Sequence, residues 1–233
     1  MTPSGKRARR LTVAIDGPAG AGKSSAARAV ARALGYTYID TGAMYRAVAL
    51  RALEHGIGLD RPDEIVELAR TARIAFEPAP DGGQRVVLDG HDVTDAIRTP
   101  EATRLSSPVS AIPGVRTVLV ELQRQLGRGG GVVMEGRDIG TVVFPQAEVK
   151  VFLTASDEER ARRRQAERVA AGAAATLEEV LKEQRERDAR DSTRGVAPLR
   201  PAEDAIVLHT DGLSLEEVVE RIVTLCRQKE SLQ

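Results

Sequence analysis

The sequence has no tryptophan and only three tyrosines and three phenylalanines in 233 residues. So few aromatic side chains predict an aliphatic core and exclude a stacking platform for single-stranded nucleic acid. Lysine and arginine together number 34, as do aspartate and glutamate, so the net charge is zero. A chain without excess positive charge has no global field that would attract DNA or RNA.

Cysteine and long apolar runs are also scarce. Cys226 is the single cysteine, which excludes an intrachain disulfide and indicates a reducing compartment, expected to be the cytoplasm. The chain has no run of 18 consecutive apolar residues, so no membrane span is predicted. At 42% hydrophobic and 29% charged residues, the composition is that of a globular protein. Residues 1–10 are basic without an apolar run after them, and we expect a disordered tail there rather than a signal peptide.

Short apolar runs alternate with stretches of helical periodicity along most of the chain. The strand candidates lie at 10–16, 38–40, 132–135, 149–153 and 205–208. The first two helices are expected at 24–34 and 42–55, and Gly35 is a typical helix stop. Strands alternating with helices predict an α/β fold, in which a parallel sheet is covered by helices on both faces.

Two segments interrupt this alternation. Residues 73–93 are interpreted as two antiparallel strands on either side of a turn, which predicts a small inserted lobe at 66–107. The core domain would then comprise residues 11–65 and 108–226. In the segment 155–195, matches to the capping box at Ser156 and Thr176 predict the starts of two helices, with a hinge at 172–175 between them.

A glycine-rich motif carries the strongest chemical signal. Residues 17–24 read GPAGAGKS and fit G-x-x-x-x-G-K-[ST] between an apolar strand and a helix. The glycines allow backbone N–H groups to converge on phosphate oxygens, and the helix N-terminus adds partial positive charge. Lys23, expected in an exposed loop, would contact the β- and γ-phosphates, and the Ser24 hydroxyl would bind Mg²⁺. The alternative, a glycine-rich turn that matches by chance, is disfavoured by the context.

This motif predicts a nucleoside triphosphate site but does not separate an ATPase, a GTPase and a kinase. The residues expected at that site are Gly17, Pro18, Ala19, Gly20, Ala21, Gly22, Lys23, Ser24 and Ser25.

Arginine is used far more than lysine, with 29 against five, although genome composition is an alternative explanation. Residues 155–195 hold ten positive and ten negative side chains, so most of them are interpreted as a solvated, ion-paired surface rather than a nucleic-acid patch. Arg187, Asp191 and Arg194 follow the spacing i, i+4, i+7 and share one helix face. Arginines with a carboxylate between them can hold a phosphate and a sugar hydroxyl together.

Charged residues also follow two of the predicted strands. The segment 135–138 (EGRD) comes directly after the strand at 132–135, and the segment 40–46 (DTGAMYR) follows the strand at 38–40. Ligands in open α/β sheets bind beyond the carboxyl ends of the strands, so both segments are candidate site segments, with an ordinary turn as the alternative. The three histidines and Cys226 show no metal-binding spacing.

Taken together, several segments closely resemble bacterial cytidylate kinases over residues 11–226. They are IDGPAGAGKSS from Ile15, DTGAMYR from Asp40, DAIR from Asp95, VSAIPGVR from Val109, GRDIGTVVFP from Gly136, ERARRR from Glu159 and RDARDSTRGVAPL from Arg187. The GRDIGTVVFP segment and the pattern RDxRDxxR are much more specific than the glycine-rich loop. One departure is that the loop here ends in GKSS where relatives carry GKGT, although Ser24 keeps a hydroxyl after the lysine.

The resemblance implies a P-loop kinase with a parallel five-stranded core sheet, a nucleoside-monophosphate-binding insert and a mobile helical lid at 155–195. It implies phosphoryl transfer from ATP to CMP or dCMP with Mg²⁺, in pyrimidine nucleotide metabolism. Separately, we expect a monomer. The residues that it places at the CMP site are Thr41, Tyr45, Arg46, Ser107, Arg116, Arg137, Asp138, Arg187, Asp191 and Arg194.

Within that implied set, three groups have different roles. Those expected to face cytosine are Ser107, Arg116 and Asp138, those near the α-phosphate are Arg46, Arg137 and Arg194, and those near the ribose are Arg187 and Asp191. Arg160 and Arg164 are the lid candidates for the donor phosphates. The residues expected to act in catalysis are Lys23, Arg137, Arg187, Arg194 and Asp16, the last by orienting metal-bound water from its place beside the P-loop.

Three other functions stay open on the sequence. A kinase for UMP or AMP would share the architecture. A nucleotide-dependent switch would share the P-loop but needs no second nucleotide pocket, and the arginines and aspartates outside the P-loop argue against it. An RNA-binding protein is disfavoured by the zero net charge of the arginine-rich segment.

Overall fold

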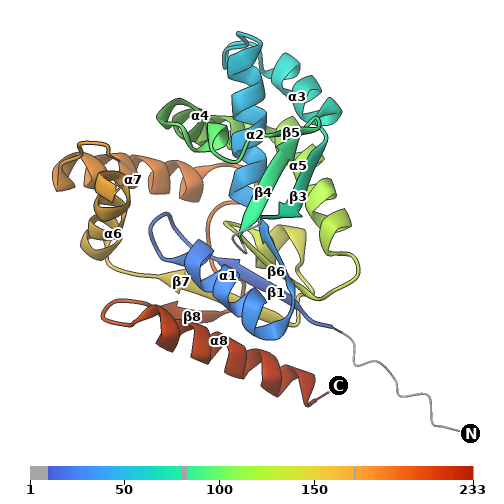
Figure 1. The fold of residues 1–233 in the computed structure, drawn as a ribbon, viewed down its shortest axis with the longest axis vertical. Coiled ribbons are helices and arrows are strands. Elements are labelled where there is room, and N and C mark those ends of the chain that lie inside the picture. The colour runs from blue at the N-terminus through green and yellow to red at the C-terminus, as the bar shows by residue number, and fades with distance from the viewer. Residues whose placement is uncertain (1–9, 80–82, 171, 233) are drawn as a thin grey trace, which may run out of the picture.

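The computed structural model describes residues 10–79, 83–170 and 172–232, so most of the predicted basic tail lies outside the described residues (Figure 1). Its centre is a five-stranded sheet in the order β2-β6-β1-β7-β8, in which all neighbouring strands are parallel. The strands are β1 (Thr12–Asp16), β2 (Thr37–Asp40), β6 (Val132–Gly136), β7 (Val149–Thr154) and β8 (Ile206–His209). The predicted α/β fold with a parallel five-stranded sheet is confirmed.

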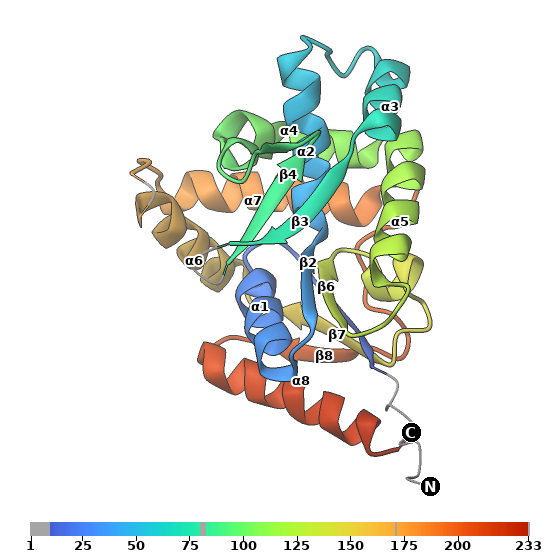
Figure 2. The ribbon, with the colours of Figure 1, turned by 45° about the vertical axis from the view of Figure 1, so that its right-hand side comes forward.

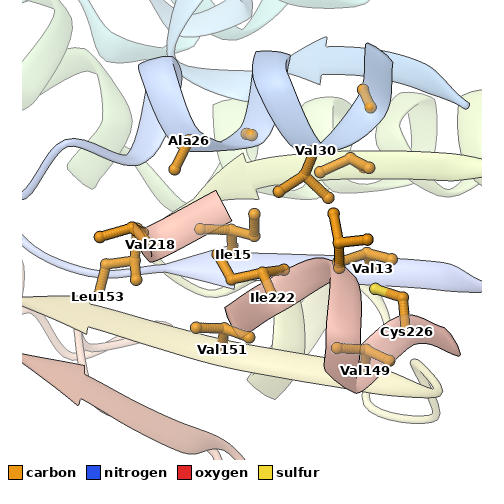
Figure 3. Close-up of a cluster of buried hydrophobic side chains, with 14 of the residues drawn as sticks. Val13, Ile15, Ala26, Val30, Val149, Val151, Leu153, Val218, Ile222 and Cys226 are labelled. Carbon is orange, nitrogen blue, oxygen red and sulfur yellow. The ribbon is translucent and has the colours of Figure 1, made fainter. Parts of the chain in front are cut away.

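Side chains of the central strand β1 alternate between two apolar layers. Val13 and Ile15 pack against α1 (Lys23–Leu34) and α8 (Leu215–Glu230), in a cluster that includes Ile222 (Figure 3). Ala14 points to the opposite face, where it belongs to a cluster with side chains of β6 and α5 (Pro113–Gly127). Both faces of the sheet are therefore covered by helices, and the largest fully buried residues are mainly aliphatic, as predicted.

A second group of helices packs around a small antiparallel sheet above the parallel one (Figure 2). The small sheet has the order β3-β4-β5. Its elements and neighbours are α2 (Thr41–Glu54), α3 (Pro62–Thr71), β3 (Ile74–Pro78), β4 (Gln84–Leu88), β5 (His91–Asp92), the 3₁₀ helix η1 (Ala96–Arg98) and α4 (Pro100–Ala111). The proposed insert boundaries, 66 and 107, fall inside α3 and α4.

The antiparallel strands of the insert are confirmed, but the second predicted strand is divided in two. Asp89 and Gly90 have positive φ values of 52° and 87°, which turn the chain between β4 and β5. The sequence interpretation treated this Asp-Gly pair as part of one strand flank. It is a two-residue turn of the kind that Asp-Gly favours.

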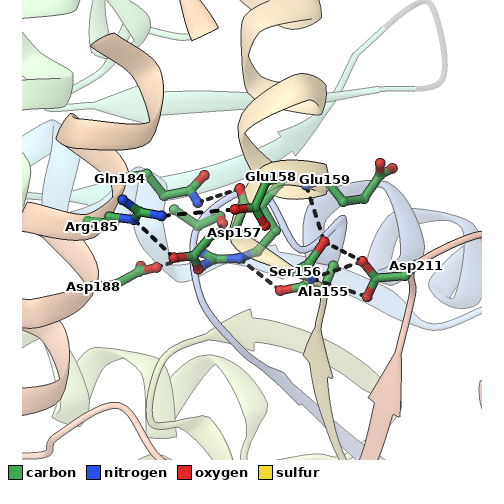
Figure 4. A network of polar contacts seen from close by, with 11 residues as sticks. Ala155, Ser156, Asp157, Glu158, Glu159, Gln184, Arg185, Asp188 and Asp211 are labelled. Atoms are coloured by element: carbon green, nitrogen blue, oxygen red, sulfur yellow. Dashed lines mark hydrogen bonds and ion pairs between the residues drawn. The ribbon is translucent and has the colours of Figure 1, made fainter. Parts of the chain in front are cut away.

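The predicted lid segment consists of α6 (Asp157–Ala170) and α7 (Leu177–Thr193), which lie side by side (Figure 1). Thr176 and Glu179 form the complete capping box at the start of α7: the Thr176 hydroxyl accepts from the N–H of Glu179, and the Glu179 carboxylate accepts from the N–H of Thr176. At α6 the prediction was half right: the Ser156 hydroxyl accepts from the N–H of Glu159 at 3.3 Å, but the N–H of Ser156 donates to Asp211 at 3.0 Å (Figure 4). The carboxylate that completes the cap therefore comes from the loop after β8.

Within the described residues, no helix is long and apolar enough to cross a membrane.

Candidate active site

A cavity of about 490 Å³ lies beyond the carboxyl ends of β1, β2 and β6. Its wall is built from the glycine-rich loop, the starts of α1 and α2, helix α4, the end of β6 and helices α6 and α7. Nine cationic side chains line it against five anionic ones, although the whole chain has no net charge. The cationic residues are Lys23, Arg28, Arg46, Arg98, Arg116, Arg137, Arg164, Arg187 and Arg194. An excess of guanidinium groups in one hollow suits ligands that carry several negative charges.

The glycine-rich loop takes the conformation that a phosphate cradle needs. Gly20 and Gly22 have φ values of 76° and 84°, a region that glycine enters without strain. At Gly20 there is also no room for a side chain, because a Cβ would lie 2.8 Å from the carbonyl oxygen of Arg160. Gly22 directly precedes α1, so the loop ends at a helix N-terminus.

Lys23 is buried, which corrects the expectation of an exposed loop position. It is the first residue of α1, is 6% exposed, and its Nζ donates to the carbonyl oxygen of Pro18 at 2.6 Å. Burial, with the positive charge of Arg137 as the next cause, lowers the pKa of Lys23 to about 7. The ammonium group is therefore held inside the ring of the loop and pointed back at its backbone.

Glu135 begins the candidate segment 135–138, but only Arg137 and Asp138 of that segment were predicted as site residues. Its carboxylate lines the cavity, is buried, and accepts from the Tyr38 hydroxyl at 2.5 Å. Burial raises the pKa of Glu135, and the charge of Asp40 adds to the increase. The signal was available in the sequence, since an isolated acidic residue at the end of an apolar strand is unusual unless it has a partner.

Two carboxylates organise the arginines on the opposite side of the cavity. Asp138 pairs with the buried Arg116, and its Oδ1 lies 3.8 Å from Nη2 of Arg194. Asp191 accepts from Nε of Arg137 at 3.0 Å. Burial alone would raise the pKa of Asp191, but the positive charges of the surrounding arginines outweigh it and lower the pKa. The structure thus brings together residues that are up to 78 positions apart in the chain, from Arg116 to Arg194.

In the described part of the chain, several donors of this arginine cluster lack a hydrogen-bond acceptor, although two of them lie 3.8–3.9 Å from a carboxylate oxygen. Among the described residues, the Nε atoms of Arg46, Arg116 and Arg187 and Nη2 of Arg194 are buried without a hydrogen-bond partner. Burial, followed by the nearby charge of Arg137, lowers the pKa of Arg187 to about 10, which leaves it charged at neutral pH. Buried donors without acceptors are costly, so this side of the cavity is preorganised for an anion.

The sequence model of the cytidylate kinase family matches residues 13–228. The chain belongs to the cytidylate kinase family. A cytidylate kinase of Desulfitobacterium hafniense is 54% identical over 221 residues, which cover 95% of this chain and 94% of that protein. A bifunctional pantoate ligase/cytidylate kinase of a Synechococcus strain is 55% identical over 230 residues. The aligned region is 98% of this chain but only 43% of that longer protein.

A solved structure of an uncharacterized protein from Eubacterium ventriosum aligns with a TM-score of 0.52 at 9% identity, covering 94% of this chain and 99% of that one. This likeness concerns the fold alone.

The structure brings most of the predicted site residues to the cavity. Nine of the ten residues predicted for CMP line it: Thr41, Tyr45, Arg46, Arg116, Arg137, Asp138, Arg187, Asp191 and Arg194. Of those predicted for ATP, the wall contains Ala19, Gly20, Lys23, Ser24, Ser25 and Arg164. The remaining members of the glycine-rich loop, Gly17, Pro18, Ala21 and Gly22, complete the turn behind this wall.

Three predicted residues outside the glycine-rich loop also lie behind the lining of the cavity. Ser107 is buried on α4, between the lining residues Ser106 and Ser110. Arg160 of α6 is 4% exposed and its guanidinium joins α7 to the P-loop: Nη1 donates to the carbonyl oxygen of Ala19 at 2.9 Å and to the carboxylate of Asp188 at 2.6 Å. The third, Asp16, is buried below the loop.

The oxygen donors in the cavity fit a magnesium ion. The Ser24 hydroxyl and the Glu135 carboxylate both line it, and they are close enough for the hydroxyl to affect the pKa of Glu135. In the part of the chain that the structure describes, no group of three or more His, Cys, Asp or Glu side chains could hold a metal ion by itself. This donor set suits Mg²⁺, which keeps several waters and is bound by few protein oxygens together with phosphate oxygens.

Proposed function

We propose that the protein transfers the γ-phosphoryl group of ATP to CMP and dCMP, forming ADP and CDP or dCDP. The observation that carries this proposal is the continuity of one cavity from the P-loop lysine to an arginine cluster with unpartnered buried donors. A phosphoryl transfer between two nucleotides needs such an arrangement, because two anionic substrates must meet with their phosphates in line. The relatives named as cytidylate kinases support cytosine as the acceptor base.

Phosphoryl transfer leaves little covalent chemistry for the protein, so positioning and charge stabilisation dominate. Lys23 would neutralise the β- and γ-phosphates, and Arg137, Arg187 and Arg194 would stabilise the charge of the moving group from the acceptor side. The acceptor phosphate is already ionised, so the site requires no strong general base. Closure of α6 and α7 would exclude water, which otherwise competes as the acceptor.

On the acceptor side, Ser107, Arg116 and Asp138 would recognise cytosine. Arg46, Arg137 and Arg194 would bind the α-phosphate, and Arg187 with Asp191 the ribose. The free donors of this cluster support that assignment, because an incoming phosphate would give them acceptors. On the donor side, Arg164 lines the cavity and would contact the ATP phosphates. Arg160 would instead hold α6 and α7 against the P-loop through its hydrogen bonds to Ala19 and Asp188.

Ser24, with Glu135 near it, would hold Mg²⁺, which supplies positive charge to the phosphates of ATP. We further propose the division into core (11–65 and 108–226), acceptor-binding insert (66–107) and lid (155–195). A monomer in the cytoplasm, acting in pyrimidine nucleotide metabolism, completes the proposal.

The decisive experiment is a coupled ADP-release assay across the eight common ribo- and deoxyribonucleoside monophosphates. We expect the highest kcat/KM with CMP or dCMP, and no turnover after Mg²⁺ is removed with EDTA. Faster turnover with UMP or AMP would overturn the choice of base. ADP formation that does not depend on any monophosphate would indicate a nucleotide hydrolase or switch instead of a kinase.

A further inference from the structure

Asp16 combines burial with contacts that the proposed chemistry does not use. It is the last residue of β1, directly before the P-loop, and is 5% exposed. Its Oδ1 accepts from the backbone N–H of Ile139 at 2.8 Å, and its Oδ2 accepts from the N–H of Gly140 at 2.7 Å. Both oxygens are thus engaged with the turn that follows β6, and the residue is not part of the cavity wall.

Burying this carboxylate is unfavourable. Burial raises the pKa of Asp16 to about 6, against the opposing effect of the two backbone hydrogen bonds. A buried carboxylate that does not line the cavity needs another role to account for its cost.

The backbone of the same residue holds the other end of the same segment. In the parallel ladder, Asp16 is paired in register with Gly136, the last residue of β6. Arg137 and Asp138 are the two residues between Gly136 and Ile139. Asp16 therefore fixes the chain immediately before this pair through its strand and immediately after it through its carboxylate.

The turn itself is a single turn of π-helix, Ile139–Val143, and its far end is also held. Arg124 of α5 donates to the carbonyl oxygens of Val142 and Val143 at 2.7 and 3.2 Å. At the near end, a Cβ on Gly140 would lie 3.4 Å from Oδ2 of Asp16 and 3.2 Å from the side chain of Lys150, so the approach of turn to carboxylate is close.

We propose that Asp16 is a positioning residue for the acceptor side of the site, which clamps Arg137 and Asp138 in the orientation that binds the nucleoside monophosphate. This inference rests on the proposed function only for the identity of that substrate. It replaces the expectation that Asp16 orients metal-bound water, since the residue does not line the cavity and each of its oxygens accepts from the turn. The P-loop backbone should not depend on the carboxylate, because β1 is paired on both sides, with β6 and with β7.

The test is Asp16→Asn, which keeps the size of the side chain but places an amide NH₂ against one of the two N–H groups. Leaving one buried donor without an acceptor should raise KM for CMP about tenfold, while KM for ATP changes less than about twofold. Amide hydrogen exchange at Ile139 and Gly140 should become faster in the same variant.

A second variant separates position from charge. Asp16→Glu keeps a carboxylate and its charge but moves both oxygens by one methylene group relative to the turn, so KM for CMP should rise again without a change in KM for ATP. The matched control is Asp204→Asn, an exposed carboxylate that pairs with Lys150 at 2.9 Å beside the same turn. It should leave both KM values as in the wild type.

Equal increases in both KM values, or unchanged values in a folded Asp16→Asn protein, would overturn the clamp. If Asp16→Asn does not fold, Asp16→Glu decides the question by the same KM comparison. If the wild type forms no ADP with CMP, the proposed function fails, and the exchange rates at Ile139 and Gly140 still decide whether Asp16 holds the turn.

Discussion

Asp138→Asn is expected to reduce the preference for CMP over UMP. The Asp138 side chain is 6% exposed and is held between Arg116 and Arg194. At the position where cytosine carries the N4 amino donor, uracil carries the O4 acceptor. A carboxylate accepts from N4–H and repels O4, whereas the amide of asparagine can donate to O4.

The size of the effect follows from the contacts. A base-edge hydrogen bond contributes about 1–3 kcal/mol of discrimination, so the ratio of kcat/KM for CMP to that for UMP should fall about 5- to 150-fold. Asparagine is a better probe than alanine here. Asparagine keeps an amide oxygen that can accept from Arg116, whose side chain is 3% exposed, whereas alanine would leave this buried guanidinium with no acceptor from residue 138; breaking such a pair costs about 3–5 kcal/mol of stability.

The assay measures ADP release with CMP and with UMP at saturating ATP. The matched control is Asp92→Asn on strand β5 of the insert, where the carboxylate is 48% exposed, and it should leave the ratio unchanged. If both pyrimidine nucleotides lose activity equally in Asp138→Asn, then Asp138 serves to anchor its two arginines, and its proposed role in base recognition is wrong.

Three further outcomes are expected. Lys23→Met should nearly abolish transfer. With a pKa of about 7 for Lys23, the folded protein binds fewer protons than the unfolded chain between pH 7 and 10, so the wild-type urea midpoint should rise with pH in that range. An equal rise in the variant would contradict this. Hydrogen exchange in α6 and α7 should slow when ATP and CMP are both bound. The buried apolar side chains of these two helices are Ala161 and Val180, so few apolar contacts stabilise them without nucleotides. Exchange that stays the same with and without nucleotides would refute the lid. Ile222→Ala should lower the free energy of unfolding by about 2–5 kcal/mol, whereas Leu215→Ala, 42% exposed, should lower it far less; similar losses in urea titrations would contradict the core described above.

The sequence by itself determined the elements whose signals are local. The apolar run before Gly17 and the helical periodicity after Lys23 predicted a strand, a loop and a helix, and the structure has β1 and α1 at those positions. Alternation of such units also predicted the parallel sheet, because parallel strands require crossover connections. Spacing also predicted one helix face for Arg187, Asp191 and Arg194, which holds for the first two; α7 ends at Thr193, so Arg194 is the C-cap residue with an extended backbone, and that part of the prediction was wrong.

Only the tertiary structure decided which side chains are buried and with what partners. Lys23 looked like an exposed loop residue because nothing in its neighbourhood along the chain reveals that the loop closes around it. The carboxylate of Asp16 meets an amide 124 positions away, and Asp211 caps a helix that begins at Asp157. Hydrogen bonds and ion pairs depend on distances of a few ångströms between segments that folding alone brings together, so periodicity and motifs carry no record of them.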